Sequence, residues 1–202
     1  KTLFPYTTLF RSLATTTLFW GAGATLQFIV IKWAEQALQL DLSKASMLQG
    51  VVAVGVAIGA VLAARMVSMR SAVRVIPLGI AMGIIVNVMI FVTDMPLAMG
   101  LMVLIGALSG FFVVPMNALL QHRGHILMGA GHSIAVQNFN ENLSILVMTG
   151  LYAFLIRSGF SINTVVVAFG LFVAGTMYLV KLRHEANQRQ FDSVAQLEDI
   201  RH

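Results

Sequence analysis

Charged residues and cysteine are scarce in this sequence. Only 10% of its 202 residues are Asp, Glu, Lys or Arg, and cysteine is absent. A soluble domain carries about 25% charged residues, so this chain is too poorly charged for a water-exposed surface. The absence of cysteine excludes disulfides and thiolate metal sites. Hydrophobic residues make up 58% of the chain and the mean hydropathy is +0.85, which excludes intrinsic disorder and indicates that the chain is surrounded by lipid.

The basic residues do not indicate a nucleic-acid partner. The formal net charge is +5 and the isoelectric point is about 10.1. However, the Lys and Arg residues lie between apolar runs and do not form a patch with interleaved aromatic residues. We therefore expect no nucleic acid and interpret these residues by the positive-inside rule of membrane proteins.

Long uncharged runs predict an all-α membrane protein with six transmembrane helices. A bilayer core requires roughly 20 apolar residues in a helix. Open strands would leave their backbone groups unsatisfied in lipid, and the runs lack the alternation of a barrel. The expected spans are residues 14–35, 47–66, 75–93, 97–120, 131–156 and 161–181.

The charges near the span ends predict the orientation. Seven basic residues fall on one side of the membrane: Arg65, Arg70, Arg74, Arg123, Lys181, Arg183 and Arg189. Only Lys44 and Arg157 fall on the other side, so the first side is expected to be cytoplasmic. Six spans place both chain ends there, together with the polar tail of residues 184–202.

The first twelve residues have a separate interpretation. Residues 2–12 read TLFPYTTLFRS, which resembles the translation of a common short-read sequencing adapter, residue for residue. We expect residues 1–12 to be an adapter artefact, with natural sequence beginning near Leu13 and a missing part N-terminal to it. The alternative is a natural amphipathic lead-in.

Small residues recur at four-residue spacing in three of the spans. The pairs are Gly55 with Gly59, Gly79 with Gly83, and Gly106 with Gly110. This spacing lets helix backbones approach closely. It is typical of ordinary membrane packing, and it also suits smooth faces that rock between conformations.

Amides and one acid gather in the fourth and fifth spans. Gln137, Asn140 and Glu141 fall on one helical face, and Asn138 lies beside it. Asn117 and Gln121 share a face of the fourth span. A charge at a helix centre costs about 2.5–3.5 kcal/mol, so Glu141 is expected to face other helices or a water-filled cavity. We interpret these six residues as a substrate pathway, and the alternative is hydrogen bonding between helices.

Other charged and ionisable groups have simpler explanations. Lys32 and Glu35 are expected to reach the interface from the outer end of the first span, although a pair between Lys32 and Glu141 is an alternative. His122, His125 and His132 are expected to belong to a positively charged cytoplasmic loop. With no HExxH sequence, P-loop or nucleophile elbow in suitable context, we expect no enzyme activity, metal or cofactor.

Three stretches resemble the bacterial lysophospholipid transporter family of the major facilitator superfamily. They read LFWGAGATLQF (18–28), GALSGFFVVPMNALLQHRG (106–124) and GAGHSIAVQNFNEN (129–142), and the resemblance runs from about Leu13 to Arg183. It implies the C-terminal half-bundle of a twelve-helix transporter. That family moves lysophosphatidylethanolamine and lysophosphatidylglycerol across the bacterial inner membrane toward the cytoplasmic face, where an acyltransferase re-acylates them.

The resemblance also implies that the N-terminal six spans are missing, so that the fragment does not transport alone. Two alternatives to a lysophospholipid transporter stay open. One is half of a major facilitator exporter for drugs or other small molecules, and the other is a non-transporting membrane scaffold. Polar groups on several helices inside the bundle favour transport, because a scaffold needs none there.

Overall fold

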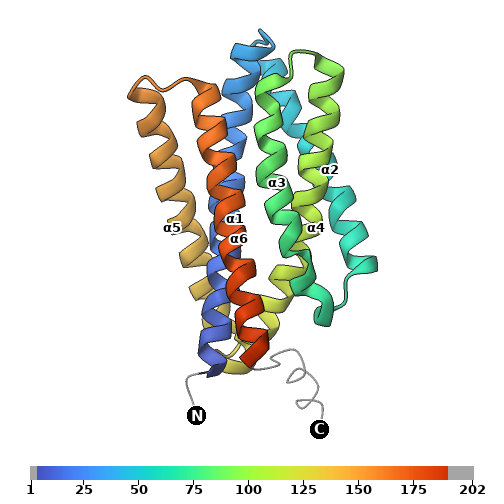
Figure 1. Cartoon of the computed structure of the whole chain (residues 1–202), viewed down its shortest axis with the longest axis vertical. Coiled ribbons are helices and arrows are strands. Elements are labelled where there is room, and N and C mark those ends of the chain that lie inside the picture. The colour runs from blue at the N-terminus through green and yellow to red at the C-terminus, as the bar shows by residue number, and fades with distance from the viewer. Residues whose placement is uncertain (1–3, 191–202) are drawn as a thin grey trace.

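A computed structural model describes residues 4–190 as six long α-helices that run alternately up and down (Figure 1). They are α1 (Phe4–Ala37), α2 (Leu42–Met66), α3 (Ile76–Val88), α4 (Met95–Met128), α5 (Ala130–Arg157) and α6 (Ile162–Gln190), with the short 3₁₀ segments η1 (Met69–Val75) and η2 (Met89–Phe91) on either side of α3. Six segments are long and apolar enough to cross a bilayer, and no strand occurs in residues 4–190. The predicted all-α, multi-pass membrane protein is confirmed.

The chain termini were expected to hold special segments. Residues 1–3 of the expected adapter segment and residues 191–202 of the polar tail lie outside the described residues. The first helix already begins at Phe4, and the last continues to Gln190.

Loop residues explain where several helices begin and end. The Asp41 carboxylate accepts a hydrogen bond from the Lys44 amide at 2.7 Å and so caps α2. Pro77 and Pro96 lie in the first turns of α3 and α4, where no hydrogen bond requires their missing N–H groups. Gly159 has φ +86°, a left-handed conformation that lets the chain reverse after α5.

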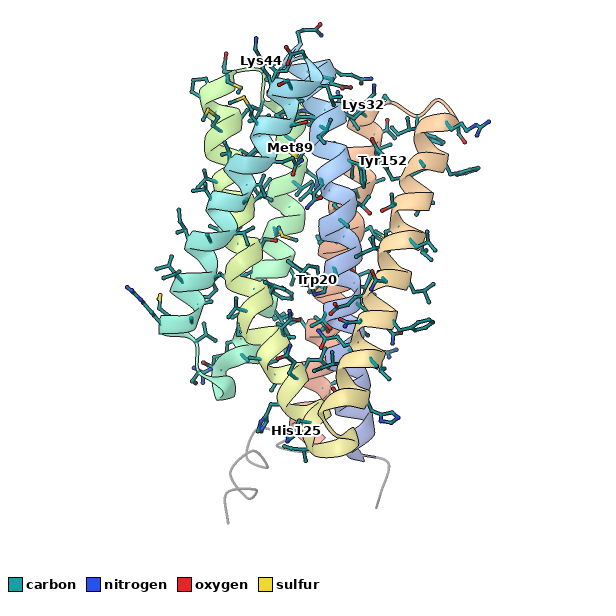
Figure 2. All side chains as sticks on the ribbon, turned by 180° about the vertical axis from the view of Figure 1, so that it is seen from behind. Trp20, Lys32, Lys44, Met89, His125 and Tyr152 are labelled. Carbon is teal, nitrogen blue, oxygen red and sulfur yellow. The ribbon has the colours of Figure 1, made fainter. Side chains whose placement is uncertain are left out.

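The connection between α4 and α5 is shorter than expected. The fourth helix continues to Met128 and the fifth begins at Ala130, so only Gly129 separates them. The loop expected around His122 and His125 does not form, because residues 121–128 contain no proline to stop the helix. Gly129, with φ +78°, makes the turn, and His125 lies at the end of the bundle opposite Lys44 (Figure 2).

The helices pack chiefly in three pairs: α2 with α4, α3 with α6, and α1 with α5. By contrast, α5 and α6 touch one another only slightly, and α5 stands at one edge of the bundle (Figure 1). The core between the pairs includes Ile29, Trp33, Leu48 and Met102, all fully buried. In the middle of the bundle, the Phe19 ring stacks on that of Phe112 with centroids 4.8 Å apart.

Glycines form the closest of these helix contacts. The two pairs Gly55–Gly59 and Gly106–Gly110 face each other across α2 and α4. A Cβ atom on any of the four would collide with backbone atoms of the facing helix. A Cβ on Gly83 of α3 would lie 2.5 Å from the Ala174 backbone nitrogen of α6. Glycine, which has no side chain, therefore sets the distance between the helices in two of the three pairs, α2 with α4 and α3 with α6.

Candidate functional site

A line of buried polar side chains runs along α5. Ser133, Gln137 and Glu141 are 5%, 6% and 9% exposed, although α5 is otherwise the most exposed of the six membrane-spanning helices. The Gln137 Nε2 atom donates a hydrogen bond to Glu141 Oε1 at 2.7 Å. The structure thus brings two of the six expected pathway residues together as a buried acid–amide pair.

The two asparagines beside this pair lie differently. The Asn140 side chain is half-buried and donates to the Val136 carbonyl at 2.7 Å. Asn138 is exposed, and its carbonyl accepts a hydrogen bond from Asn142. Because both contacts stay within α5, neither asparagine joins the acid–amide pair directly.

The fourth helix contributes one of its two expected residues to the bundle interior. Asn117 is half-buried, and its Oδ1 atom has no hydrogen-bond partner among the described residues. Gln121, one turn later, is exposed. Leaving a buried acceptor such as Asn117 Oδ1 without a hydrogen-bond donor lowers the stability of the fold. Asn117 is therefore the residue of α4 that is available to a polar ligand.

Two contacts between helices show that Thr17, Asn117 and Glu141 lie at about the same level along the bundle. Gly21 of α1 packs against Ser144 of α5, and these two helices run in the same direction. Moving one turn toward their N-termini places Thr17 level with Glu141. The Phe19–Phe112 contact places Asn117, five residues further along the antiparallel α4, close to the same level. The helices α1, α4 and α5 all touch one another, so a polar layer lies where they meet.

Sequence reasoning missed the contribution of α1 to this layer. Thr15 and Thr16 are 2% and 1% exposed, and the Thr17 hydroxyl is buried without a hydrogen-bond partner among the described residues. Three consecutive threonines within a span were a visible signal. Threonine can satisfy its hydroxyl on its own helix, as Thr25 does on the Gly21 carbonyl at 2.8 Å, so the run alone did not indicate a site.

A pair between Lys32 and Glu141 does not form. Lys32 instead binds Glu35 on its own helix, with Nζ and Oε2 3.2 Å apart. It lies near the opposite end of the bundle from His125 (Figure 2), and helical rise separates it from the level of Glu141 by about 20 Å. Glu141 therefore has an amide and not a cation as its partner.

The polar layer offers hydrogen-bonding groups inside an apolar bundle. It contains one carboxyl group, two amides and several hydroxyls, which can bind a polar or charged group that enters the bundle. Within residues 4–190, no group of three His, Asp or Glu side chains is arranged to hold a metal ion.

Comparison with known proteins identifies close relatives. No family model matches the chain, and no solved structure matches it. The lysophospholipid transporters LplT of Yersinia pestis (strain Pestoides F) and Yersinia pseudotuberculosis (serotype O:3, strain YPIII) are each 45% identical to it over 149 residues, which is 73% of this chain. The chain spans 37% of the length of these relatives. The resemblance to the bacterial lysophospholipid transporter family that the motifs led us to expect is confirmed over 149 residues of this chain.

Proposed function

We propose that this chain is the C-terminal half of a transporter that moves lysophosphatidylethanolamine and lysophosphatidylglycerol across the bacterial inner membrane, toward the cytoplasmic face. The observation that carries the proposal is the 45% identity to proteins named lysophospholipid transporters. The buried polar layer of α1, α4 and α5 supports transport over a scaffold role.

The helix pairing supports a major facilitator half-bundle. Halves of this superfamily contain two inverted three-helix repeats. If the two repeats, α1–α3 and α4–α6, are exchanged, α1 takes the place of α4, α2 that of α5 and α3 that of α6. The α1–α5 pair then becomes the α4–α2 pair, and the α3–α6 pair becomes itself. The three main pairs of this bundle obey that exchange, as expected for two such repeats.

The polar layer has a role in this mechanism. A lysophospholipid head group that crosses the bundle must exchange water for protein hydrogen bonds. We propose that Glu141 meets the ammonium of the ethanolamine head group, and that Gln137 and Asn117 meet phosphate or glycerol oxygens. Asn138, Asn140 and Gln121 complete the proposed pathway nearer to surfaces that other parts of the transporter cover.

The proposal includes the missing parts of the system. The remaining partners are a six-span N-terminal half and, functionally, an acyltransferase at the cytoplasmic face. We propose that both ends of this chain lie in the cytoplasm. We also propose that residues 1–12 come from a sequencing adapter. Resequencing the locus tests this, and a continuous reading frame without the adapter string would contradict it.

Uptake measurements test the function. Cells that lack their own lysophospholipid transporter are complemented with the complete gene, and spheroplasts are given radiolabelled lysophosphatidylethanolamine. Appearance of labelled diacyl phosphatidylethanolamine is expected only in complemented cells. Equal re-acylation with the empty vector would contradict lysophospholipid transport and would favour an exporter of other small molecules.

A further inference from the structure

An apolar groove lies between α1, α5 and α6, away from the polar layer. Its volume is about 210 Å³, and α5 and α6 leave it open because they touch one another so little. Residues from the three helices line it, among them Thr25, Ile29, Met148, Tyr152, Phe169 and Phe172. The only hydroxyl on its α1 side, that of Thr25, is engaged by the Gly21 carbonyl. The groove therefore presents a hydrocarbon surface.

The groove opens sideways at the depth of the bilayer. Leu151 and Phe172 belong to its lining and are 51% and 42% exposed. Both lie inside the membrane-spanning segments of α5 and α6. The medium outside the opening is therefore lipid hydrocarbon, and a lipid chain can enter the groove without crossing water.

An ion pair lies above one end of the groove. Lys32 is one helical turn beyond Ile29 on the same face of α1 and binds Glu35 at 3.2 Å. The two side chains are 41% and 30% exposed, so both remain accessible. Tyr152 lies just below Lys32 (Figure 2), and its hydroxyl donates to the Phe28 carbonyl at 3.4 Å.

We propose that this groove is a binding site for a single-chain phospholipid, with the acyl chain between α1, α5 and α6 and the head group at Lys32 and Glu35. The inference rests on the proposed function for the identity of the lipid. It commits to this occupant because of charge complementarity. A phosphate fits Lys32, an ethanolamine ammonium fits Glu35, and an apolar groove continues from them in the direction that an acyl chain takes into the bilayer.

The site lies at the membrane end opposite the basic residues of η1. In the proposed orientation this is the outer leaflet, so the groove would hold substrate before its head group reaches the polar layer at Glu141. A helix face that only meets bulk lipid would require neither a groove nor an ion pair above it, since burying charge near hydrocarbon is costly.

Photo-crosslinking tests the position of the acyl chain. The complete transporter, reconstituted in vesicles, is illuminated with lysophosphatidylethanolamine that carries a diazirine near the end of its chain. We expect label on residues 148–155 and 165–172, and competition by unlabelled lysophosphatidylethanolamine. Equal competition by two-chain phosphatidylethanolamine would overturn the proposal, because it would identify ordinary boundary lipid.

A matched pair of substitutions on α6 tests the groove itself. Ala168 lines the groove and Leu171, on the same helix, does not, although it is 61% exposed. Ala168→Trp fills the groove and is expected to reduce labelling at least several-fold. Leu171→Trp adds the same side chain facing lipid and is expected to leave labelling unchanged. Equal effects of the two variants would contradict the groove as the binding site.

Substitutions at the ion pair test the head-group contacts. Glu35→Gln is expected to weaken labelling by lysophosphatidylethanolamine, but not by lysophosphatidylglycerol, which has no ammonium. Lys32→Gln is expected to weaken labelling by both, since both carry a phosphate. Unchanged labelling in both variants would overturn the assignment of the head group.

Uptake in the same preparations separates this inference from the proposed function. Normal lysophosphatidylethanolamine uptake without labelling of the groove would contradict the groove and leave transport intact. Competitive labelling of the groove without any uptake by the wild-type protein would contradict transport and leave a lipid-binding groove.

Discussion

Glu141 is a carboxyl group inside the bundle whose hydrogen-bond partner is a neutral amide. Its Oε1 atom accepts from Gln137 at 2.7 Å, and it is 9% exposed. An acid in this setting needs water, a hydrogen-bond donor or a ligand cation to be stable in its charged form. Among the described residues, Lys32 and Lys181 form ion pairs with Glu35 and Glu185 and not with Glu141.

Replacing Glu141 by Gln in the complete transporter should lower transport and not folding. The variant keeps the side-chain shape and can still accept from Gln137, but it loses the charge that we propose meets the head-group ammonium. We expect lysophosphatidylethanolamine uptake by spheroplasts to fall about tenfold at unchanged protein level, equivalent to about 1.4 kcal/mol.

The control for this variant is Glu185→Gln, the same change near the end of α6, outside the apolar core. It removes an ion pair with Lys181 that joins exposed side chains at 3.7 Å, which contributes little, and should leave uptake unchanged. Wild-type uptake by the Glu141 variant would show that the acid has no transport role. Loss of the protein instead of uptake would favour hydrogen bonding between helices as its role.

The contact of α2 with α4 depends on glycine on both helices. Gly106 and Gly110 face backbone atoms of Val52 and Val56, where a Cβ atom would collide. Backbone cannot move aside as a flexible side chain can, so any added bulk must separate the helices. The four-residue spacing in these two spans therefore reflects one shared interface.

Gly110→Leu should destabilise the protein. Overpacking of a tight contact costs about 1–3 kcal/mol, so we expect a lower melting temperature in detergent and lower expression. Gly100→Leu, two to three turns earlier on α4, is the matched control. A Cβ there has nothing within 4 Å, and the variant should melt like the wild type. Equal melting temperatures for the two variants would contradict the observed α2–α4 contact.

The alternation of six helices places η1 at one end of the bundle and the start of α2 at the other. Ser68, just before η1, is exposed, as is Ser43 in the first turn of α2. Arg65 and Arg74 flank Ser68, and Lys181 and Arg183 lie at the same end of the bundle. This charge distribution underlies the proposed cytoplasmic position of residues 65–74.

Single cysteines test the orientation, and this chain has no cysteine of its own to interfere. In intact cells, a membrane-impermeant maleimide should label Ser43→Cys and should fail to label Ser68→Cys until the cells are permeabilised. Rapid labelling of Ser68→Cys in intact cells would reverse the topology. It would also move the proposed lipid groove to the inner leaflet.

The number and type of the helices follow from the sequence. The thickness of the bilayer sets the length of a membrane-spanning helix, and the surrounding lipid requires its side chains to be mostly apolar. The uncharged runs met both conditions, and Asp41, Pro77 and Pro96 mark helix starts by local chemistry that needs no tertiary contact. The sequence did not reveal the end of α4, because the residues before Gly129 suit a helix as well as a loop. It also did not reveal how deeply each polar residue of 137–142 is buried, since Asn140 shares the face of Gln137 and Glu141 and is only half-buried.

The inward face depends on the neighbouring helices. Spans that are apolar on all sides carry little information about their buried face. Helical spacing groups Gln137 with Asn140 and Glu141, but it does not say how deeply each of them is buried. Packing of α5 against α1 and α4 buries Gln137 and leaves Asn138 exposed. Packing between helices also decides three other features. These are the partner of Gly110, the position of the α1 threonines at the level of Glu141, and the groove below Lys32. Each requires residues far apart in the chain to meet, and a periodic pattern within one helix does not specify its neighbour.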